Sequence, residues 1–142
     1  TCGTFLALVY SVLRDRICEY SICIDGQDVF NGPALNVTVG KNPYIASGLK
    51  LSFDVEPSDS NFYVFAISQR SRLGFLSAVR GAYSGDIAKD STNYSTLLQG
   101  NHTVRISASG PVKYEMDGDG YGKLPVSFET KPQALEIVGS RA

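Results

Sequence analysis

Two aspartates separated by one glycine form the densest acidic cluster of the sequence. The stretch 115–122 reads Glu-Met-Asp-Gly-Asp-Gly-Tyr-Gly, and its aspartates are Asp117 and Asp119. Closely spaced carboxylates can bind a hard cation, or one of them can take a proton from a hydroxyl group. An EF-hand calcium loop is excluded, because its ninth and twelfth positions would be Pro125 and Phe128 and the bidentate glutamate is missing. A Gly-rich hairpin turn, in which Asp and Gly only supply turn conformations, stays an alternative interpretation.

The segments on both sides of this cluster alternate between apolar and polar residues, as strands do. A strand is expected from Ile17 to Ile24, and the pair Asp25-Gly26 predicts a hairpin that returns through residues 29–30. Helical spacing of apolar residues predicts two short helices, at 4–16 and 71–81. The chain is therefore expected to be mainly β, an antiparallel β-sandwich of two sheets or a closely related barrel, with one or two short helices. Further strands are expected at 34–39, 49–55, 62–68, 94–98, 102–108, 112–116, 124–130 and 134–138.

Length and charge set the broad class of the protein. The 142 residues, of which 43% are hydrophobic, suit one core, so residues 1–142 are expected to form a single domain. The 13 basic and 14 acidic residues are dispersed and give a net charge of −1, which excludes an electrostatically driven nucleic-acid partner. The longest apolar stretch, residues 5–10, is far shorter than the ~20 residues that cross a bilayer.

Cysteines and glycosylation sequons point to different compartments. The three cysteines are an odd number and lack zinc-ligand spacing, which favours reduced thiols in the cytoplasm. Asn36, Asn93 and Asn101 each begin an N-x-S/T sequon, which is used only on secreted chains. We expect a cytoplasmic protein, and a secreted, non-catalytic β-sandwich binding module is the alternative.

The string from Val112 to Val138 resembles the C-terminal end of the diacylglycerol kinase catalytic family, which includes bacterial lipid kinases and the sphingosine kinases. A strand ends in Asp-Gly-acid, a short Gly loop follows, and then come a Leu-Pro strand and a final Pro-x-Ala-Leu-x-Ile-Val strand. The helix at 5–13, the Asp25-Gly26 hairpin, the strand and small-residue turn at 34–48 and the loop and strand at 58–65 are similar to earlier family elements and come in the same order. The resemblance covers essentially the whole chain.

This resemblance implies roles for the acidic cluster. Asp117 would be the general base that takes the proton from a lipid hydroxyl, with Asp119 as its neighbour and substitute. Gly118, Gly120 and Gly122 would let the backbone approach the triphosphate of ATP. Asp119 stands where the family usually has Glu, which preserves the charge and shortens the reach.

The resemblance also implies a magnesium site at the loop before the strand 62–68. Asp59 would bind Mg²⁺ together with the backbone carbonyls of Glu56 and Asn61, and oxygen ligands suit this hard cation. The loop departs from the family pattern, because Ser60 replaces the usual Gly and Ser58 replaces the first of two acids. A solvated turn in which Asp59 caps nearby amides is the alternative.

The nucleotide-binding half of the family has no counterpart here, since the sequence contains neither a Gly-Gly-Asp-Gly-Thr loop nor a Walker pattern. The chain is thus expected to be the C-terminal half of a two-domain lipid kinase, inactive alone, with ATP bound mainly by the other domain. The expected partners are ATP with Mg²⁺ and a diacylglycerol- or sphingoid-like alcohol, with peripheral membrane contact and a homodimer both allowed. A nicotinamide dinucleotide kinase relative is a further alternative.

Overall fold

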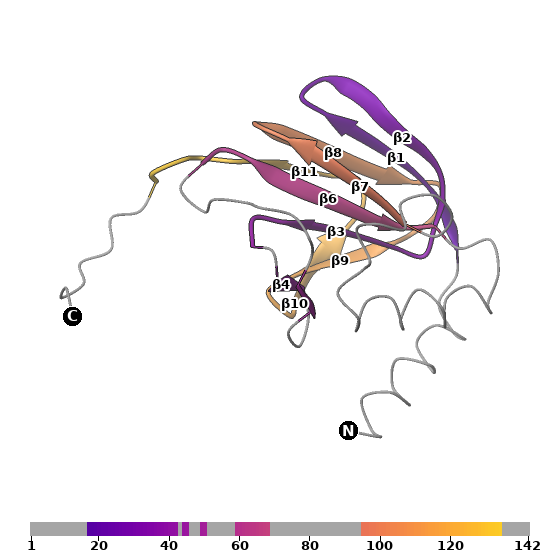
Figure 1. Ribbon diagram of the computed structural model, residues 1–142. Coiled ribbons are helices and arrows are strands. Elements are labelled where there is room, and N and C mark those ends of the chain that lie inside the picture. The colour runs from indigo at the N-terminus through magenta and orange to yellow at the C-terminus, as the bar shows by residue number, and fades with distance from the viewer. Residues whose placement is uncertain (1–16, 43, 46–48, 51–58, 69–94, 135–142) are drawn as a thin grey trace.

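The fold is an antiparallel arrangement of short strands, seen in a computed structural model (Figure 1). The structure describes residues 17–42, 44–45, 49–50, 59–68 and 95–134. All of its strand pairs are antiparallel. The predicted mainly β class is confirmed, while the predicted helices at 4–16 and 71–81 lie outside the described residues. No helix in the described part is long and apolar enough to cross a membrane.

The first sheet has four strands in the order β11-β8-β1-β2. These are β1 (Cys18–Ile24), β2 (Gln27–Ala34), β8 (Thr103–Ala108) and β11 (Val126–Glu129). β1 and β2 form the predicted hairpin, with Ile24 paired to Gln27 across Asp25-Gly26. In β1, Tyr20, Ile22 and Ile24 are buried and the residues between them are not, as the alternating pattern predicts.

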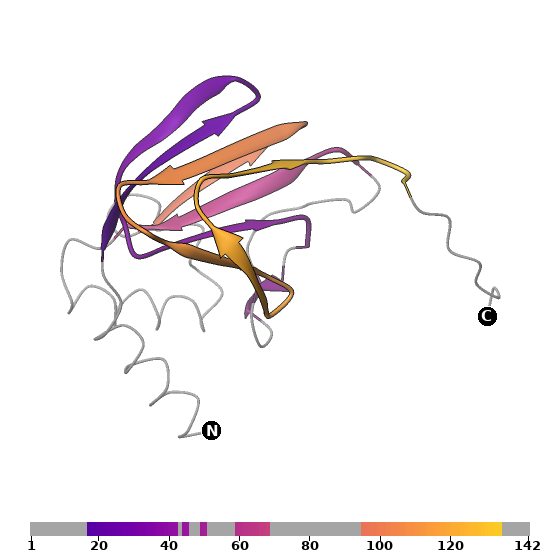
Figure 2. The ribbon, with the colours of Figure 1, turned by 180° about the vertical axis from the view of Figure 1, so that it is seen from behind.

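The second sheet has three strands in the order β3-β6-β7. They are β3 (Asn36–Gly40), β6 (Phe62–Ile67) and β7 (Ser95–Gly100). Two further pairs join β4 (Tyr44–Ile45) to β5 (Leu49–Lys50) and β9 (Lys113–Met116) to β10 (Asp119–Lys123). Figure 2 shows the β9–β10 hairpin extending away from the first sheet, between β8 and β11 along the chain.

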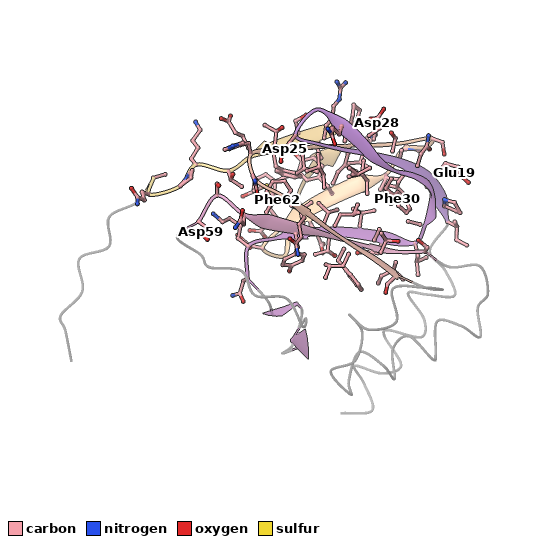
Figure 3. The ribbon with its side chains drawn as sticks, turned by 45° about the horizontal axis from the view of Figure 1, so that its top comes forward. Glu19, Asp25, Asp28, Phe30, Asp59 and Phe62 are labelled. Carbon is pink, nitrogen blue, oxygen red and sulfur yellow. The ribbon has the colours of Figure 1, made fainter. Side chains whose placement is uncertain are left out.

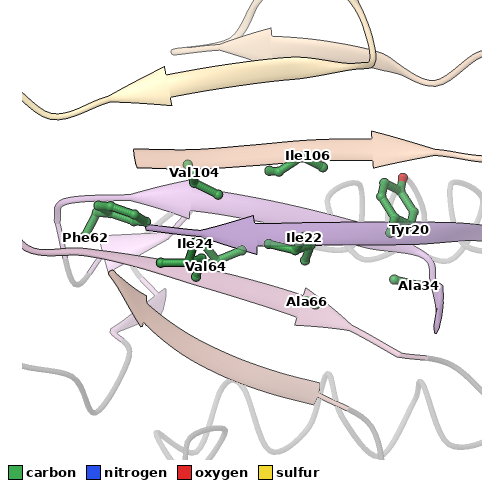
Figure 4. Close-up of a cluster of buried hydrophobic side chains, with 9 residues drawn as sticks. All are labelled: Tyr20, Ile22, Ile24, Ala34, Phe62, Val64, Ala66, Val104 and Ile106. Atoms are coloured by element: carbon green, nitrogen blue, oxygen red, sulfur yellow. The ribbon is translucent and has the colours of Figure 1, made fainter. Parts of the chain in front are cut away.

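The core lies between the inner faces of the two sheets (Figure 4). Burying a side chain such as that of Ile22, which has no exposed surface, contributes about 1.5–3 kcal/mol. Strand β6 is buried on both faces, because Tyr63 and Phe65 are buried as well as the residues that face β1. The buried cluster consists of Tyr20, Ile22, Ile24, Ala34, Phe62, Val64, Ala66, Val104 and Ile106.

Two predicted boundaries are wrong. The strand expected at 34–39 begins at Asn36, because Ala34 completes β2 and the chain changes sheets at Leu35, whose N–H donates to the carbonyl of Ile67 at 2.8 Å. The Gly-rich loop expected around 117–122 is only two residues long, since Asp119 already pairs with Met116. Of the strands expected at 49–55 and 134–138, residues 51–55 and 135–138 lie outside the described part.

Candidate functional site

The acidic cluster forms a tight β-hairpin between β9 and β10. Met116 pairs with Asp119, so Asp117 and Gly118 are the two turn residues. Their φ angles are 51° and 91°, the left-handed conformation that a type I′ turn requires at both positions. Asp tolerates this conformation better than most residues and Gly adopts it without a steric cost. The local sequence therefore explains the turn by itself.

Both predicted catalytic carboxylates lie on the surface of this hairpin. Asp117 is at the first turn position and Asp119 is the first residue of β10, and both residues are exposed. Within the part of the chain that the structure describes, neither side chain has a hydrogen-bond or ion-pair partner. The structure therefore brings Asp117 and Asp119 together on one short hairpin, and their carboxylates are free to meet a ligand.

The three glycines of the hairpin differ in whether backbone conformation or packing requires a glycine at their position. Gly118 needs its positive φ, whereas a Cβ on Gly120 would meet no atom within 4 Å and its φ is not positive. Gly122 is covered by Tyr114, whose Cε1 atom would lie 3.0 Å from an added Cβ. Packing thus explains Gly122 and turn geometry explains Gly118, but nothing in the described structure requires a glycine at position 120.

An aromatic contact connects the base of the hairpin to the first sheet. Tyr114 of β9 and Phe128 of β11 meet edge to face, with ring centroids 6.1 Å apart and an interplanar angle of 86°. Such pairs contribute about 0.5–1.5 kcal/mol beyond the area they bury. The N–H of Leu124 donates to the carbonyl of Val112 at 2.9 Å and closes the hairpin at the same end. The turn with Asp117 thus projects from a supported base.

Two apolar side chains on the hairpin were not singled out from the sequence. Tyr121 is 64% exposed and Met116 is 42% exposed. Tyr121 lies at a β-bulge, because Gly120 pairs with Glu115 and Gly122 with Tyr114, which leaves Tyr121 without a partner in the register. A strand pattern alone does not reveal a bulge, so the sequence offered no signal for this exposure.

The predicted metal loop lies just before β6, where Figure 3 labels Asp59. Asp59 and Asn61 are both exposed. The Nζ atom of Lys41 donates a hydrogen bond to the main-chain carbonyl of Asp59. Glu56 lies outside the described residues. The ligand set of Asp59, Glu56 and Asn61 therefore stays a prediction, and the cation that the structure places at this loop is an ammonium group.

The carboxylate with the most hydrogen bonds in the described part is that of Asp25, which was not predicted as a site residue. It accepts hydrogen bonds from the N–H groups of Asn101, His102 and Thr103, at 2.8, 2.9 and 2.8 Å. The bonds from Thr103 and Asn101 contribute most to holding the pKa of Asp25 below its ordinary value of 3.8. The Asp-Gly pair indicated the turn, but no local signal indicates its contact with a segment 76 residues away.

Comparison with known proteins agrees with this architecture. Residues 5–139 match the family described as the YegS C-terminal NAD kinase beta sandwich-like domain. The chain belongs to this family. The predicted resemblance to the diacylglycerol kinase group is confirmed at the level of the family, since the match covers nearly all of the chain. No curated protein matches the chain.

Solved structures of proteins from Bacillus anthracis str. Sterne share the fold. They are named as diacylglycerol kinases, two of them provisionally, and their TM-scores are 0.65, 0.66 and 0.61. Sequence identity is 17%, 19% and 15%, and 94%, 89% and 94% of this chain is covered. The chain spans only 48%, 41% and 47% of those proteins, about half of their length.

The described part of this YegS-type domain has few other candidate binding or metal sites. Two shallow hollows of about 410 and 340 Å³ lie on the outer face of the first sheet and share Cys23 and Arg105. Neither hollow is lined by Asp117, Asp119 or Asp59. No group of three metal-binding His, Cys, Asp or Glu residues occurs among the described residues, where Cys18 and Cys23 are free thiols.

Proposed function

We propose that this YegS-type domain is the acceptor-side half of an ATP-dependent lipid kinase of the diacylglycerol kinase type. Its family membership and its likeness to about half of each diacylglycerol kinase structure support this assignment. A second domain, supplied by the same protein, binds most of the ATP. The isolated chain is therefore expected to be inactive, because phosphoryl transfer depends on holding the nucleotide and the acceptor together.

The observation that carries the proposal is the exposed carboxylate of Asp117 at the tip of a supported hairpin, where it has no partner among the described residues. A general base must reach the proton that it removes, and an exposed turn allows that reach. In the proposed reaction, Asp117 accepts the proton of the lipid hydroxyl while the hydroxyl oxygen forms a bond to the γ-phosphorus and the bond to ADP breaks. Asp119 lies beside it and holds the acceptor or replaces the base.

Gly118 and Gly120 are proposed to face the nucleotide. No side chain covers the backbone at these two glycines, since a Cβ built on either of them would meet no atom within 4 Å. This fits the close approach of a triphosphate to the main chain beside the two carboxylates. The nucleotide, bound with Mg²⁺, supplies the phosphoryl group. The residues of this chain position the acceptor and take up its proton.

The acceptor is proposed to be a diacylglycerol- or sphingoid-like alcohol, taken from a membrane that the protein contacts from the cytoplasm. Exposed Met116 and Tyr121 lie next to the carboxylates in the sequence and add apolar surface to this hairpin, which suits a lipid. A homodimer is proposed through an edge of the first sheet, where β2 and β11 are the outer strands.

The test is a phosphoryl-transfer assay on the full-length protein with radiolabelled ATP. Phospholipid vesicles carry diacylglycerol or sphingosine, and parallel reactions contain soluble NAD or no acceptor. Label in a lipid product, dependent on Mg²⁺, supports the proposal. Label in NAD alone would indicate a nicotinamide dinucleotide kinase, and no transfer to any acceptor would favour a binding module; both results contradict a lipid kinase.

A further inference from the structure

The loop before β6 is in contact with a positive charge, the ammonium group of Lys41, which follows β3. The ammonium Nζ donates to the main-chain carbonyl of Asp59, which lies 18 residues further along the chain. Lys41 follows the last residue of β3, and Asp59 lies three positions before the first residue of β6. The contact therefore joins the two neighbouring strands of the second sheet at their shared open end, where Figure 3 labels Asp59.

The backbone that carries Lys41 is held in place. Gly40 pairs with Tyr63 in the β3–β6 register, and the Tyr63 side chain covers Gly40 so closely that a Cβ there would collide with the ring and its hydroxyl. Tyr63 itself is buried. Lys41 is half-buried, whereas Asp59 is exposed. A fixed starting point and a partly buried stem reduce the entropy lost when the ammonium binds the carbonyl.

An ammonium group and a divalent metal ion compete for such a loop. Both bind carbonyl and carboxylate oxygens, and an ammonium offers three donors, of which one is used at Asp59. A metal bound by the Asp59 carboxylate would lie beside a positive charge that the same residue's carbonyl holds. Like charges repel, and the repulsion grows where the surroundings are partly buried.

We propose that the Lys41 ammonium is the resident cation of the Asp59 loop and takes the place of the metal ion that the family resemblance implies there. The loop then needs no Mg²⁺ to hold its conformation. Any Mg²⁺ that the protein uses enters with a nucleotide at another place. Asp59 contributes its main-chain carbonyl to this arrangement, and its carboxylate only adds favourable negative charge near the ammonium.

The first test measures Mn²⁺ binding without nucleotide, by electron paramagnetic resonance, in the full-length wild type and in Asp59→Asn. Asp28→Asn is the matched control, since Asp28 is also exposed and lies in β2, in the other sheet. The titrations of all three proteins are expected to coincide up to about 1 mM Mn²⁺, which covers weak oxygen-ligated sites. Mn²⁺ that binds the wild type and Asp28→Asn but not Asp59→Asn would overturn the proposal.

The second test measures thermal unfolding of Lys41→Met, which keeps the stem and removes the charge and the donors. Lys131→Met is the control, because Lys131 is exposed. Lys41→Met is expected to lower Tm by about 2–4 °C relative to Lys131→Met, and EDTA is expected to leave the Tm of the wild type unchanged. Equal Tm values for the two variants, or an EDTA effect that Asp59→Asn abolishes, would contradict a resident ammonium. Neither test depends on kinase activity.

Discussion

Two hairpins of this protein have the same turn residues, Asp-Gly, but the aspartate side chains have different surroundings. The β1–β2 turn is Asp25-Gly26 and the β9–β10 turn is Asp117-Gly118, each closing a two-residue loop. The φ angles of the two aspartates are 50° and 51°, and those of the two glycines are 82° and 91°. By backbone geometry the two turns are the same type I′ turn.

The difference lies in what surrounds the aspartate side chain. Asp25 accepts three N–H groups from the turn between β7 and β8, and its own N–H donates to the carbonyl of Thr103 at 3.0 Å. Asp117 has no partner in the described part of the chain. The same dipeptide thus ties two hairpins together in one place and presents a free carboxylate in the other. Turn chemistry alone does not indicate whether an aspartate carboxylate is bound by backbone N–H groups or left exposed without a partner in the described residues.

The largest difference between the two turns is expected in kcat, when each aspartate is replaced by asparagine. The proposed role of Asp117 predicts that Asp117→Asn in the full-length protein lowers kcat about 10²–10⁴-fold, because the amide cannot accept the proton, while Tm stays within about 1 °C of the wild type. Asp25→Asn should retain kcat per folded molecule. Steady-state kinetics with thermal unfolding on the same samples checks this. An equal loss of kcat in both variants would remove Asp117 from the mechanism.

The next effect concerns stability, and here the substitution of Asp25 is expected to have the larger effect. Asp25→Ala should lower the free energy of unfolding by about 2 kcal/mol, because three N–H groups lose their acceptor and Ala is strained at positive φ. Asp117→Ala should lower it by only about 1 kcal/mol, since the strain alone remains. Urea unfolding of both variants measures the difference. If the two values agree, the contacts of Asp25 with residues 101–103 contribute nothing to stability.

Substitution of the glycines should show that the two turns are alike in their backbone. Gly26→Ala and Gly118→Ala are each expected to cost about 1 kcal/mol, since both glycines have positive φ and open surroundings. Gly120→Ala should leave the free energy of unfolding unchanged, because its φ is not positive and a Cβ has room there. It should lower kcat/KM about tenfold if a nucleotide approaches this backbone closely. An unchanged kcat/KM would refute the proposed role of Gly120.

The smallest effect is a dependence of stability on pH. The folded-state pKa of Asp25 is lowered from 3.8, so its contribution to stability is fully present above that value and is lost as pH falls through the folded pKa. Asp25→Asn should therefore lose less stability than the wild type between about pH 6 and pH 3. Urea unfolding at both pH values measures this. Asp117→Asn serves as the control, and a matching change there would place the acid sensitivity elsewhere.

Much of the architecture could be predicted from local patterns. The alternation of Tyr20, Ile22 and Ile24 predicted β1 and its buried face, because successive side chains of a strand point to opposite sides. The Asp117-Gly118 turn was expected only as part of a longer Gly-rich loop around 117–122. The Asp25-Gly26 turn was predicted at the right residues. The strand at 119–123 was not, because two of its five residues are glycines, which are poor strand formers and indicate a loop. Its pairing comes from the tight turn before it.

The sequence by itself determined the mainly β class, the hairpin turn at Asp25-Gly26, the family and the pair of carboxylates at 117 and 119. These follow from neighbouring residues or from short motifs, so local geometry is enough to specify them. Only the tertiary structure decided that Asp25 holds the turn at 101–103 and that Lys41 reaches the carbonyl of Asp59. Both contacts join segments far apart in the chain, and their partners are backbone groups that every residue carries, so no residue type signals them in advance.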